Sequence, residues 1–126
     1  MKMAAPTAYG LEVVDEARLA QIVGAIVERF HPRRILLFGS RARGEHQPDS
    51  DVDLFIEMES PDPPHERKCK VRSLFPDRRW ALDLVVYTPA EVLQYRPMRG
   101  LVLSLIEAEG KVLYEQPASS RGSVAP

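Results

Sequence analysis

Hydrophobic residues recur at helical spacing near the start of the chain and then form short uninterrupted runs. Apolar positions three or four residues apart predict an amphipathic helix over residues 16–30, with Asp15 as its N-cap and Pro32 just beyond its end. The run Ile35–Phe38 is apolar at every position and stops at a glycine. Such a run is typical of a strand that is buried on both faces.

The pattern after residue 50 predicts two further strands, three helices and an edge strand. The strands are predicted at 52–58 and 81–87, with an edge strand at 112–114. Between the first two strands lies a weaker helix, whose apolar positions are Cys69, Val71, Leu74 and Phe75. A short helix near Glu91 is opened by Thr88-Pro89, and the next helix, which stops at Gly110, has Leu101, Val102, Leu105 and Ile106 on one face. This order predicts an α/β (α+β) fold with a small mixed β-sheet flanked by helices. We expect one domain over residues 11–115 and a disordered tail over 116–126.

Composition narrows the class of protein. The chain has 126 residues, 44% hydrophobic and 28% charged, with no apolar run long enough to span a bilayer. The first ten residues lack the apolar segment of a secretory signal, so we expect a cytoplasmic protein with no membrane contact. The single cysteine, Cys69, excludes an internal disulfide and is expected to be a half-buried structural thiol.

Charge does not favour nucleic-acid binding. The net charge is −1, which provides no global field to attract a polyanion. Residues 66–80 hold six basic and two acidic side chains. This run is short for a nucleic-acid footprint, and a solvated face is the favoured interpretation.

A phosphate-binding turn is predicted where the first strand ends, at Gly39-Ser40. A glycine lets the backbone approach a ligand closely, and exposed N–H groups together with the Ser40 hydroxyl suit phosphate oxygens. A simple turn remains the alternative for this feature taken alone.

Asp51 and Asp53 lie two residues apart at the start of the second strand. Period-two geometry places both carboxylates on one face, while Val52, Leu54 and Ile56 point to the core. Adjacent like charges are costly without a cation or donors between them, and Mg²⁺ prefers such oxygen ligands. Two solvated acids at the start of a strand remain the alternative.

Asp83 is the only charged residue in the apolar third strand, so we expect it to have a partner: a metal, backbone donors, or an arginine such as Arg78 or Arg79. Two aspartates on one strand and a third on a neighbouring strand match the needs of metal-assisted phosphoryl transfer.

The spacing of these residues resembles that of a known family. Gly39-Ser40, ten residues, then Asp51-x-Asp53 is similar to the G-S-x10-D-x-D signature of DNA polymerase β-like nucleotidyltransferases, and the surrounding residues 37–54 resemble the small branch called minimal nucleotidyltransferases. Asp83 falls where that family carries its third carboxylate. The resemblance covers residues 15 to 115.

The resemblance implies a polymerase β-like nucleotidyltransferase fold and a set of roles. Gly39 and Ser40 would hold the triphosphate, and Asp51, Asp53 and Asp83 would bind two Mg²⁺ ions, with Mn²⁺ as a substitute. Asp83 could also act as the base. Arg41 and Arg43 lie within the motif, where a phosphate contact and a surface role are both open.

The chain is too short to carry a separate acceptor-binding domain, so a partner is expected to supply the acceptor. In the resembled family the partner is often a helical HEPN protein, and the pair forms a toxin and antitoxin in which the toxin is adenylylated. We therefore expect transfer of AMP from ATP to a partner hydroxyl. The alternatives are a module that neutralises its partner by contact alone, and transfer to a small molecule such as an aminoglycoside. The base preference and the formation of a homo-oligomer stay open.

Overall fold

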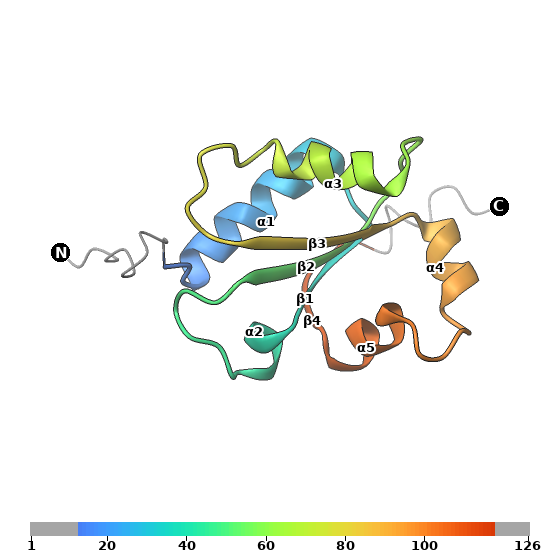
Figure 1. Cartoon of the computed structure of the whole chain (residues 1–126). Coiled ribbons are helices and arrows are strands. Elements are labelled where there is room, and N and C mark those ends of the chain that lie inside the picture. The colour runs from blue at the N-terminus through green and yellow to red at the C-terminus, as the bar shows by residue number, and fades with distance from the viewer. Residues whose placement is uncertain (1–12, 118–126) are drawn as a thin grey trace.

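The computed structural model describes residues 13–117, which build a four-stranded sheet with helices on both faces (Figure 1). The elements are α1 (Glu16–Phe30), β1 (Arg34–Phe38), α2 (Ser40–Arg43), β2 (Val52–Glu57), α3 (Pro64–Arg72), β3 (Leu82–Tyr87), α4 (Pro89–Tyr95), α5 (Val102–Glu109) and β4 (Lys111–Glu115). The predicted fold class is confirmed. The first ten residues and most of the predicted tail lie outside the described residues.

The sheet is mixed, with strand order β3-β2-β1-β4. Strand β1 runs antiparallel to both β2 and β4, whereas β2 and β3 are parallel. A parallel pair needs a crossover between its strands, and the segment that contains α3 provides it. Strand β4 lies at the edge of the sheet, as the sequence predicted.

Helix α1 forms where the apolar periodicity predicts it. The Asp15 side chain accepts a hydrogen bond from the backbone N–H of Arg18 at 2.8 Å and caps the first turn. The helix ends at Phe30, and its C-cap, His31, adopts a left-handed conformation with φ of 50°. Ile22 and Ile26 on its inner face are buried against the sheet.

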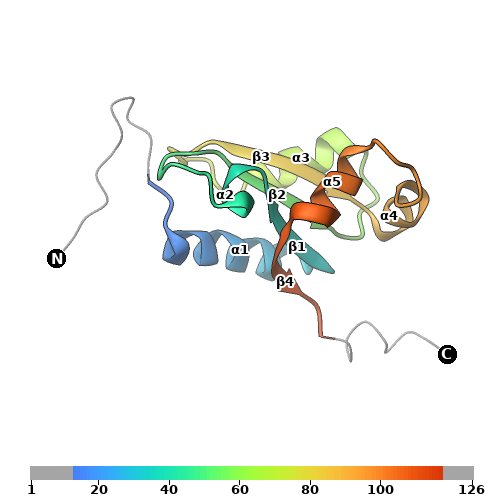
Figure 2. The same cartoon turned by 90° about the horizontal axis from the view of Figure 1, so that it is seen from below.

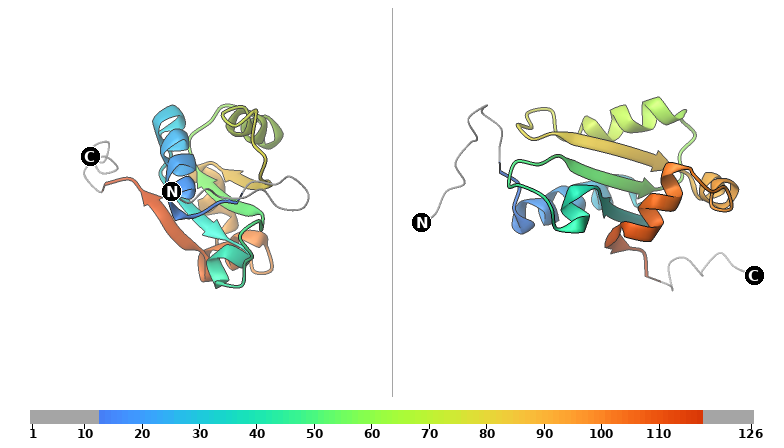
Figure 3. Two further views of the ribbon diagram at one scale, coloured as in Figure 1. Left: turned by 90° about the vertical axis from the view of Figure 1, so that its left-hand side faces the viewer. Right: turned by 60° about the horizontal axis from the view of Figure 1, so that its bottom comes forward.

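Helices α1 and α3 cover one face of the sheet, and α4 and α5 cover part of the other, as Figure 2 and the left view of Figure 3 show. The first face carries the larger core, with Ile35, Leu37, Val52, Leu54, Ile56, Leu84 and Val86 from the strands. On the second face a smaller core joins Leu36, Phe55, Val92, Leu103 and Ile106. Alternate residues of β1, β2 and β3 therefore enter different cores.

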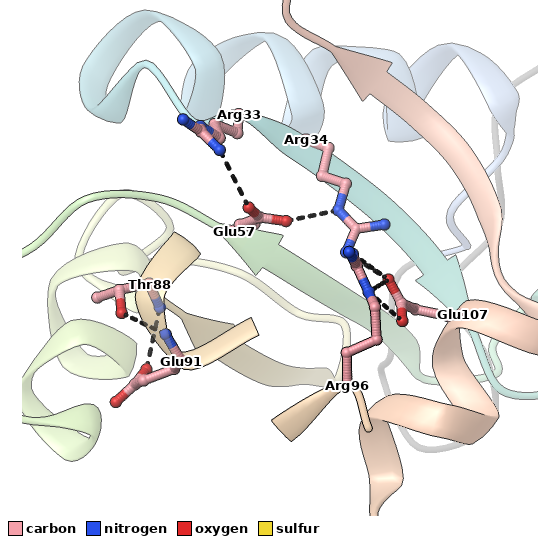
Figure 4. Close-up of polar contacts among 7 residues, drawn as sticks. All are labelled: Arg33, Arg34, Glu57, Thr88, Glu91, Arg96 and Glu107. Atoms are coloured by element: carbon pink, nitrogen blue, oxygen red, sulfur yellow. Dashed lines mark hydrogen bonds and ion pairs between the residues drawn. The ribbon is translucent and has the colours of Figure 1, made fainter. Parts of the chain in front are cut away.

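An ion network fastens α5 to one end of the sheet (Figure 4). Arg34 on β1 donates to Glu57 on β2 at 2.6 Å and to Glu107 on α5 at 2.7 Å. Arg96 also donates to Glu107, and its hydrogen bond, followed by that of Arg34, lowers the pKa of this carboxyl. Glu57 pairs with Arg34 in the antiparallel register, four residues along β2 from Asp53. The network thus stabilises the end of the sheet that is remote from the predicted active site.

Two predictions about α3 and its surroundings need correction. Cys69 is exposed, not half-buried, and its sulfur lies 3.5 Å from the His65 ring, because both side chains follow the outer face of α3. The helix ends at Arg72, so Phe75 lies beyond it and packs on Trp80, with ring centroids 5.5 Å apart.

The predicted inner face of α5 was correct for Ile106 and wrong for the other three residues. Leu103 and Ile106 are its buried residues, whereas Leu101, Val102 and Leu105 are exposed. The helix begins only at Val102, and its packing on Phe55 turns Leu103 toward the sheet.

Within residues 13–117, each helix is too short or too polar to cross a membrane.

Candidate active site

Gly39 brings the turn after β1 against the carboxylate of Asp53. Its φ is 74°, a conformation that L-residues with a side chain rarely adopt. A Cβ atom built at this position would overlap the Oδ2 atom of Asp53. Strand register explains the approach, because Phe38, the residue before Gly39, pairs with Asp53 across the antiparallel ladder. The predicted phosphate-binding turn and the predicted metal-binding strand therefore meet directly.

Asp53 and Asp83 stand side by side on neighbouring strands. They are register partners in the parallel pair of β2 and β3. Both alternate with the residues that enter the larger core, since Val52 and Leu54 flank Asp53 and Leu82 and Leu84 flank Asp83. Two of the three predicted carboxylates therefore share one face. Asp51 is two residues before Asp53, just outside β2, and is exposed.

This face is open where the acids lie. Helices α4 and α5 pack on Phe55, Val85 and Tyr87, toward the far end of β2 and β3 (Figure 3, right). Asp53 is half-buried and Asp83 is exposed. The expectation that Asp83 needs a partner because its strand is buried is therefore incorrect: β3 is an edge strand, and this part of its open face reaches solvent.

Arg78, one of the two arginines considered as partners of Asp83, donates to the Phe75 carbonyl at 3.3 Å.

The charges of Asp51 and Asp83 act on the Asp53 carboxylate. Burial, followed by the negative charges of Asp83 and Asp51, raises the pKa of Asp53 to about 6. The charges of Arg41 and Arg43 oppose this rise. Binding of a cation next to the Asp53 carboxylate is therefore strongly favoured at neutral pH.

The donor chemistry of the three acids fits a hard divalent cation. All three offer carboxylate oxygens, the ligands that Mg²⁺ prefers. Within residues 13–117, however, no three His, Cys, Asp or Glu side chains are gathered closely enough to hold an ion by themselves. A complete coordination shell here therefore requires further oxygens, and the phosphates of a bound nucleotide are their natural source.

Arg41 lies in a different environment from the predicted one. Its guanidinium is buried, with 6% of the residue exposed, and it makes five hydrogen bonds to four backbone carbonyls. Burial lowers the pKa of Arg41, and the charges of Asp53, Asp49 and Asp51 oppose this shift. The suggested phosphate contact of Arg41 does not fit this arrangement, because the donors of the guanidinium already face the chain.

Ser40 and Arg43 remain accessible. Ser40 is half-buried and opens α2, where the first N–H groups have no acceptor within the helix. Arg43 is exposed, donates to Glu45 at 2.8 Å and lies 3.8 Å from Glu109. These ion pairs are solvent-exposed and therefore weak enough to exchange for a phosphate.

A separate apolar cavity of about 1000 Å³ runs between α1 and β4. Leu19, Val23, Leu37, Leu113 and Tyr114 are among its lining residues. Leu37 belongs to the core on the α1 side of the sheet, so the cavity lies on the opposite face from Asp53 and Asp83. It has no carboxylate of the predicted site in its lining.

Sequence reasoning missed two features of this region. The hydrogen bonds from Arg41 to backbone carbonyls join residues up to 27 positions apart, and no local sequence pattern predicts them. The same holds for Arg67, which is buried on α3 and pairs with Glu91 on α4 at 2.6 Å. Charged residues such as these two arginines are usually exposed, and only their tertiary contacts reveal that they are buried.

Comparison with known proteins agrees with this fold. A protein of Sulfolobus solfataricus that has been assigned to the nucleotidyltransferases superposes with a TM-score of 0.55 at 19% identity, over 78% of this chain and 78% of that chain. A toxin-antitoxin structure with AMP-PNP superposes with a TM-score of 0.50 at 20% identity, over 81% of this chain and 77% of that chain. At these identities the likeness shows the fold. A search of curated proteins found no match.

The fold of this protein is therefore a nucleotidyltransferase fold. Residues 19–113 match the nucleotidyltransferase domain family, and the chain belongs to that family. The predicted enzyme class, a nucleotidyltransferase, is confirmed at this level, and the resemblance to the minimal branch is consistent with it. Nucleotidyltransferase domains in general use divalent metal ions.

Proposed function

We propose that this protein is an Mg²⁺-dependent enzyme that transfers AMP from ATP to a hydroxyl group of a partner protein. The observation that carries the proposal is the meeting of Gly39, Asp53 and Asp83: a glycine turn against one carboxylate and a second carboxylate beside it in register. This arrangement combines room for a triphosphate with oxygen ligands for a cation.

Each residue has a part in the proposed reaction. The Gly39-Ser40 backbone and the Ser40 hydroxyl bind the triphosphate. Asp51, Asp53 and Asp83 would hold Mg²⁺, with two ions and Mn²⁺ substitution as further expectations, and bound metal would offset the charge of the phosphates and the leaving pyrophosphate. The acceptor oxygen bonds to the α-phosphorus, the bond from that phosphorus to the bridging oxygen breaks, and the hydroxyl proton passes to Asp83.

A protein acceptor is favoured by the surface next to the open face. All the exposed large hydrophobic side chains in the described part of the chain fall between residues 93 and 112. They are Leu93, Met98, Leu101, Val102, Leu105 and Val112. Exposed apolar side chains that are concentrated in one segment of a domain mark a contact surface for another protein. A fold relative seen in a toxin-antitoxin structure with AMP-PNP supports a protein partner by analogy. The helical HEPN type of this partner is what the family resemblance of the sequence implies.

The test is a transfer assay with matched variants. Wild type, Asp53→Asn and the control Asp77→Asn are each mixed with the co-purifying partner, Mg²⁺ and each α-labelled nucleoside triphosphate in turn. Asp77 is an exposed acid on the loop before β3. We expect label on the partner from wild type and Asp77→Asn, with ATP preferred, and none from Asp53→Asn.

Two outcomes would replace the proposal. Equal silencing of the partner by wild type and Asp53→Asn, with no label transferred from any triphosphate, would make the protein a module that acts by contact. Label on an added aminoglycoside in place of the partner would make the acceptor a small molecule.

A further inference from the structure

The side chain of Arg41 connects three segments of the chain near the candidate site. Its Nε donates to the carbonyls of Ser50 and Asp51, both at 3.2 Å. Its Nη1 donates to Val14 at 2.9 Å, and its Nη2 donates to Pro48 at 3.0 Å and Ser50 at 2.9 Å. One guanidinium thus holds the loop before β2 and the residue just before the N-cap of α1.

These contacts link the phosphate-binding turn to the metal-binding strand. Arg41 is the second residue of α2, directly after the Gly39-Ser40 turn. The carbonyl of Asp51 belongs to the residue that starts the acid motif, and the next amide, that of Val52, donates to Ala81 before β3 at 2.8 Å. The backbone at Asp51 is therefore held by Arg41 on one side and by the β3 segment on the other.

The loop has few other means of holding its shape. Residues 44–51 contain no helix or strand, and residues 43–48 are exposed. The Gln47 amide donates to the Ser50 hydroxyl, and the Ser50 amide donates to the Gln47 carbonyl, but both bonds lie within the loop. Contacts from outside are needed to orient the loop on the rest of the domain. The Val14 amide donates one hydrogen bond to the Pro48 carbonyl at 3.3 Å, and Arg41 supplies four.

Only an arginine can make this set of contacts. The guanidinium carries five N–H donors in a planar fork, whereas the lysine ammonium is a compact group with three donors at one point. Arg41→Lys would keep the positive charge near the acids but could not reach four carbonyls that lie on both sides of the fork. This substitution therefore separates the charge of Arg41 from its geometry.

We propose that Arg41 is a positioning residue: it sets the distance between the Gly39-Ser40 turn and Asp51 through the backbone, without touching nucleotide or metal. This inference rests on the proposed function, because it names the residue that orders the same site. The alternative role, in which Arg41 acts by its positive charge alone, predicts that Arg41→Lys behaves as wild type.

The control variant is Arg67→Lys. Arg67 is an equally buried arginine on α3 that donates to the Asp62 carbonyl at 2.8 Å and the Val86 carbonyl at 3.1 Å and pairs with Glu91 on α4. Its replacement by lysine should cause a comparable general loss of stability, because it too removes buried hydrogen bonds to carbonyls. A difference between the two variants at the loop therefore reports position, not stability.

The first experiment measures hydrogen exchange of the full chain without ligand. In Arg41→Lys the amides of Ser50 and Val52 should exchange roughly tenfold faster than in wild type, while those of β1 change only as much as they do in Arg67→Lys. The dissociation constant for Mn²⁺ with α,β-methylene-ATP should rise in Arg41→Lys alone. Unchanged loop exchange, or an equal effect in both variants, would overturn the positioning role.

A second measurement uses the wild type, so that it decides the matter even if Arg41→Lys does not fold. Nitrogen-15 NMR should show separate, slowly exchanging Nη–H signals for Arg41, as for Arg67, because both guanidinium groups are held by carbonyls. A single averaged Arg41 signal would overturn the inference. If the wild type binds no Mn²⁺ with α,β-methylene-ATP, the proposed function fails, while the exchange and NMR results still judge the carbonyl contacts.

Discussion

Asp53 on β2 and Asp83 on β3 are register partners on parallel strands, so their carboxylates stand next to each other on the open face of the sheet. Nothing in packing requires two acids there, since the neighbouring residues on the opposite face form the core without them. The arrangement stores repulsion that a bound cation or a proton relieves. Four predictions concern this site and its supports, and one concerns the partner surface.

The first prediction concerns turnover. Asp53→Asn retains the shape of the side chain but loses a charge that would hold metal, so transfer should fall by orders of magnitude while partner binding stays nearly unchanged. Labelled-ATP transfer and partner pull-down measure the two quantities on the same samples. Full activity in the variant would remove Asp53 from the site.

The second prediction concerns pH and the metal-free protein. The pKa of Asp53 is raised from its ordinary 3.8 to about 6, so the folded state binds a proton more tightly than the unfolded state. The unfolding free energy contributed by Asp53 should therefore fall as pH rises through this window. Melting temperatures in EDTA from pH 4 to 8 should show Asp53→Asn gaining stability relative to wild type toward neutral pH. A constant difference would refute the shift.

The third prediction uses two glycines that share a positive φ, although ψ is −156° at Gly39 and 16° at Gly44. Gly39 and Gly44 have φ of 74° and 75°, but a Cβ meets the Asp53 carboxylate at Gly39 and nothing within 4 Å at Gly44. Gly44→Ala should cost about 1 kcal/mol of stability and leave transfer intact. Gly39→Ala should cost more and abolish binding of Mn²⁺ with α,β-methylene-ATP. Equal effects of the two variants in calorimetry would argue against the close approach.

The fourth prediction concerns the support of β3 by α3 and α4. The hydrogen bond from Arg67 lowers the pKa of Glu91, so this pair stabilises the fold at neutral pH and its contribution is lost as pH falls below about 4.5. Glu91→Gln should lose about 1–3 kcal/mol at pH 7, because Arg67 loses the negative charge and one of its two acceptor oxygens on this side chain. Its denaturation midpoint should vary less with acid than that of wild type.

The fifth prediction concerns the proposed partner surface. Leu93 is 72% exposed and Leu105 is 53% exposed. Changing both to lysine should abolish co-purification of the partner without lowering the melting temperature, because neither side chain enters the core. Gln94→Lys adds charge at an exposed neighbouring position of α4 and should bind normally. Retained binding by the double variant would place the partner elsewhere.

Local sequence was sufficient for most of the elements. Helix α1 was predicted from its apolar spacing and from Asp15, and α4 was predicted from the Thr88-Pro89 pair. Thr88 and Glu91 form the reciprocal capping bonds expected at such a helix start. The alternation around Asp53 predicted which residues of β2 enter the core. These features depend on contacts between residues close in sequence or on a strict period, which a sequence displays directly.

Tertiary structure alone decided the rest. Asp51-x-Asp53 and the glycine turn were visible in the sequence, but their meeting depends on the antiparallel register of β1 with β2, and the position of Asp83 on the parallel register of β2 with β3. The burial of Arg41, the exposure of Cys69 and the inward face of α5 were missed for the same reason. Each depends on which segment packs opposite, and that is decided by contacts between residues far apart in the chain.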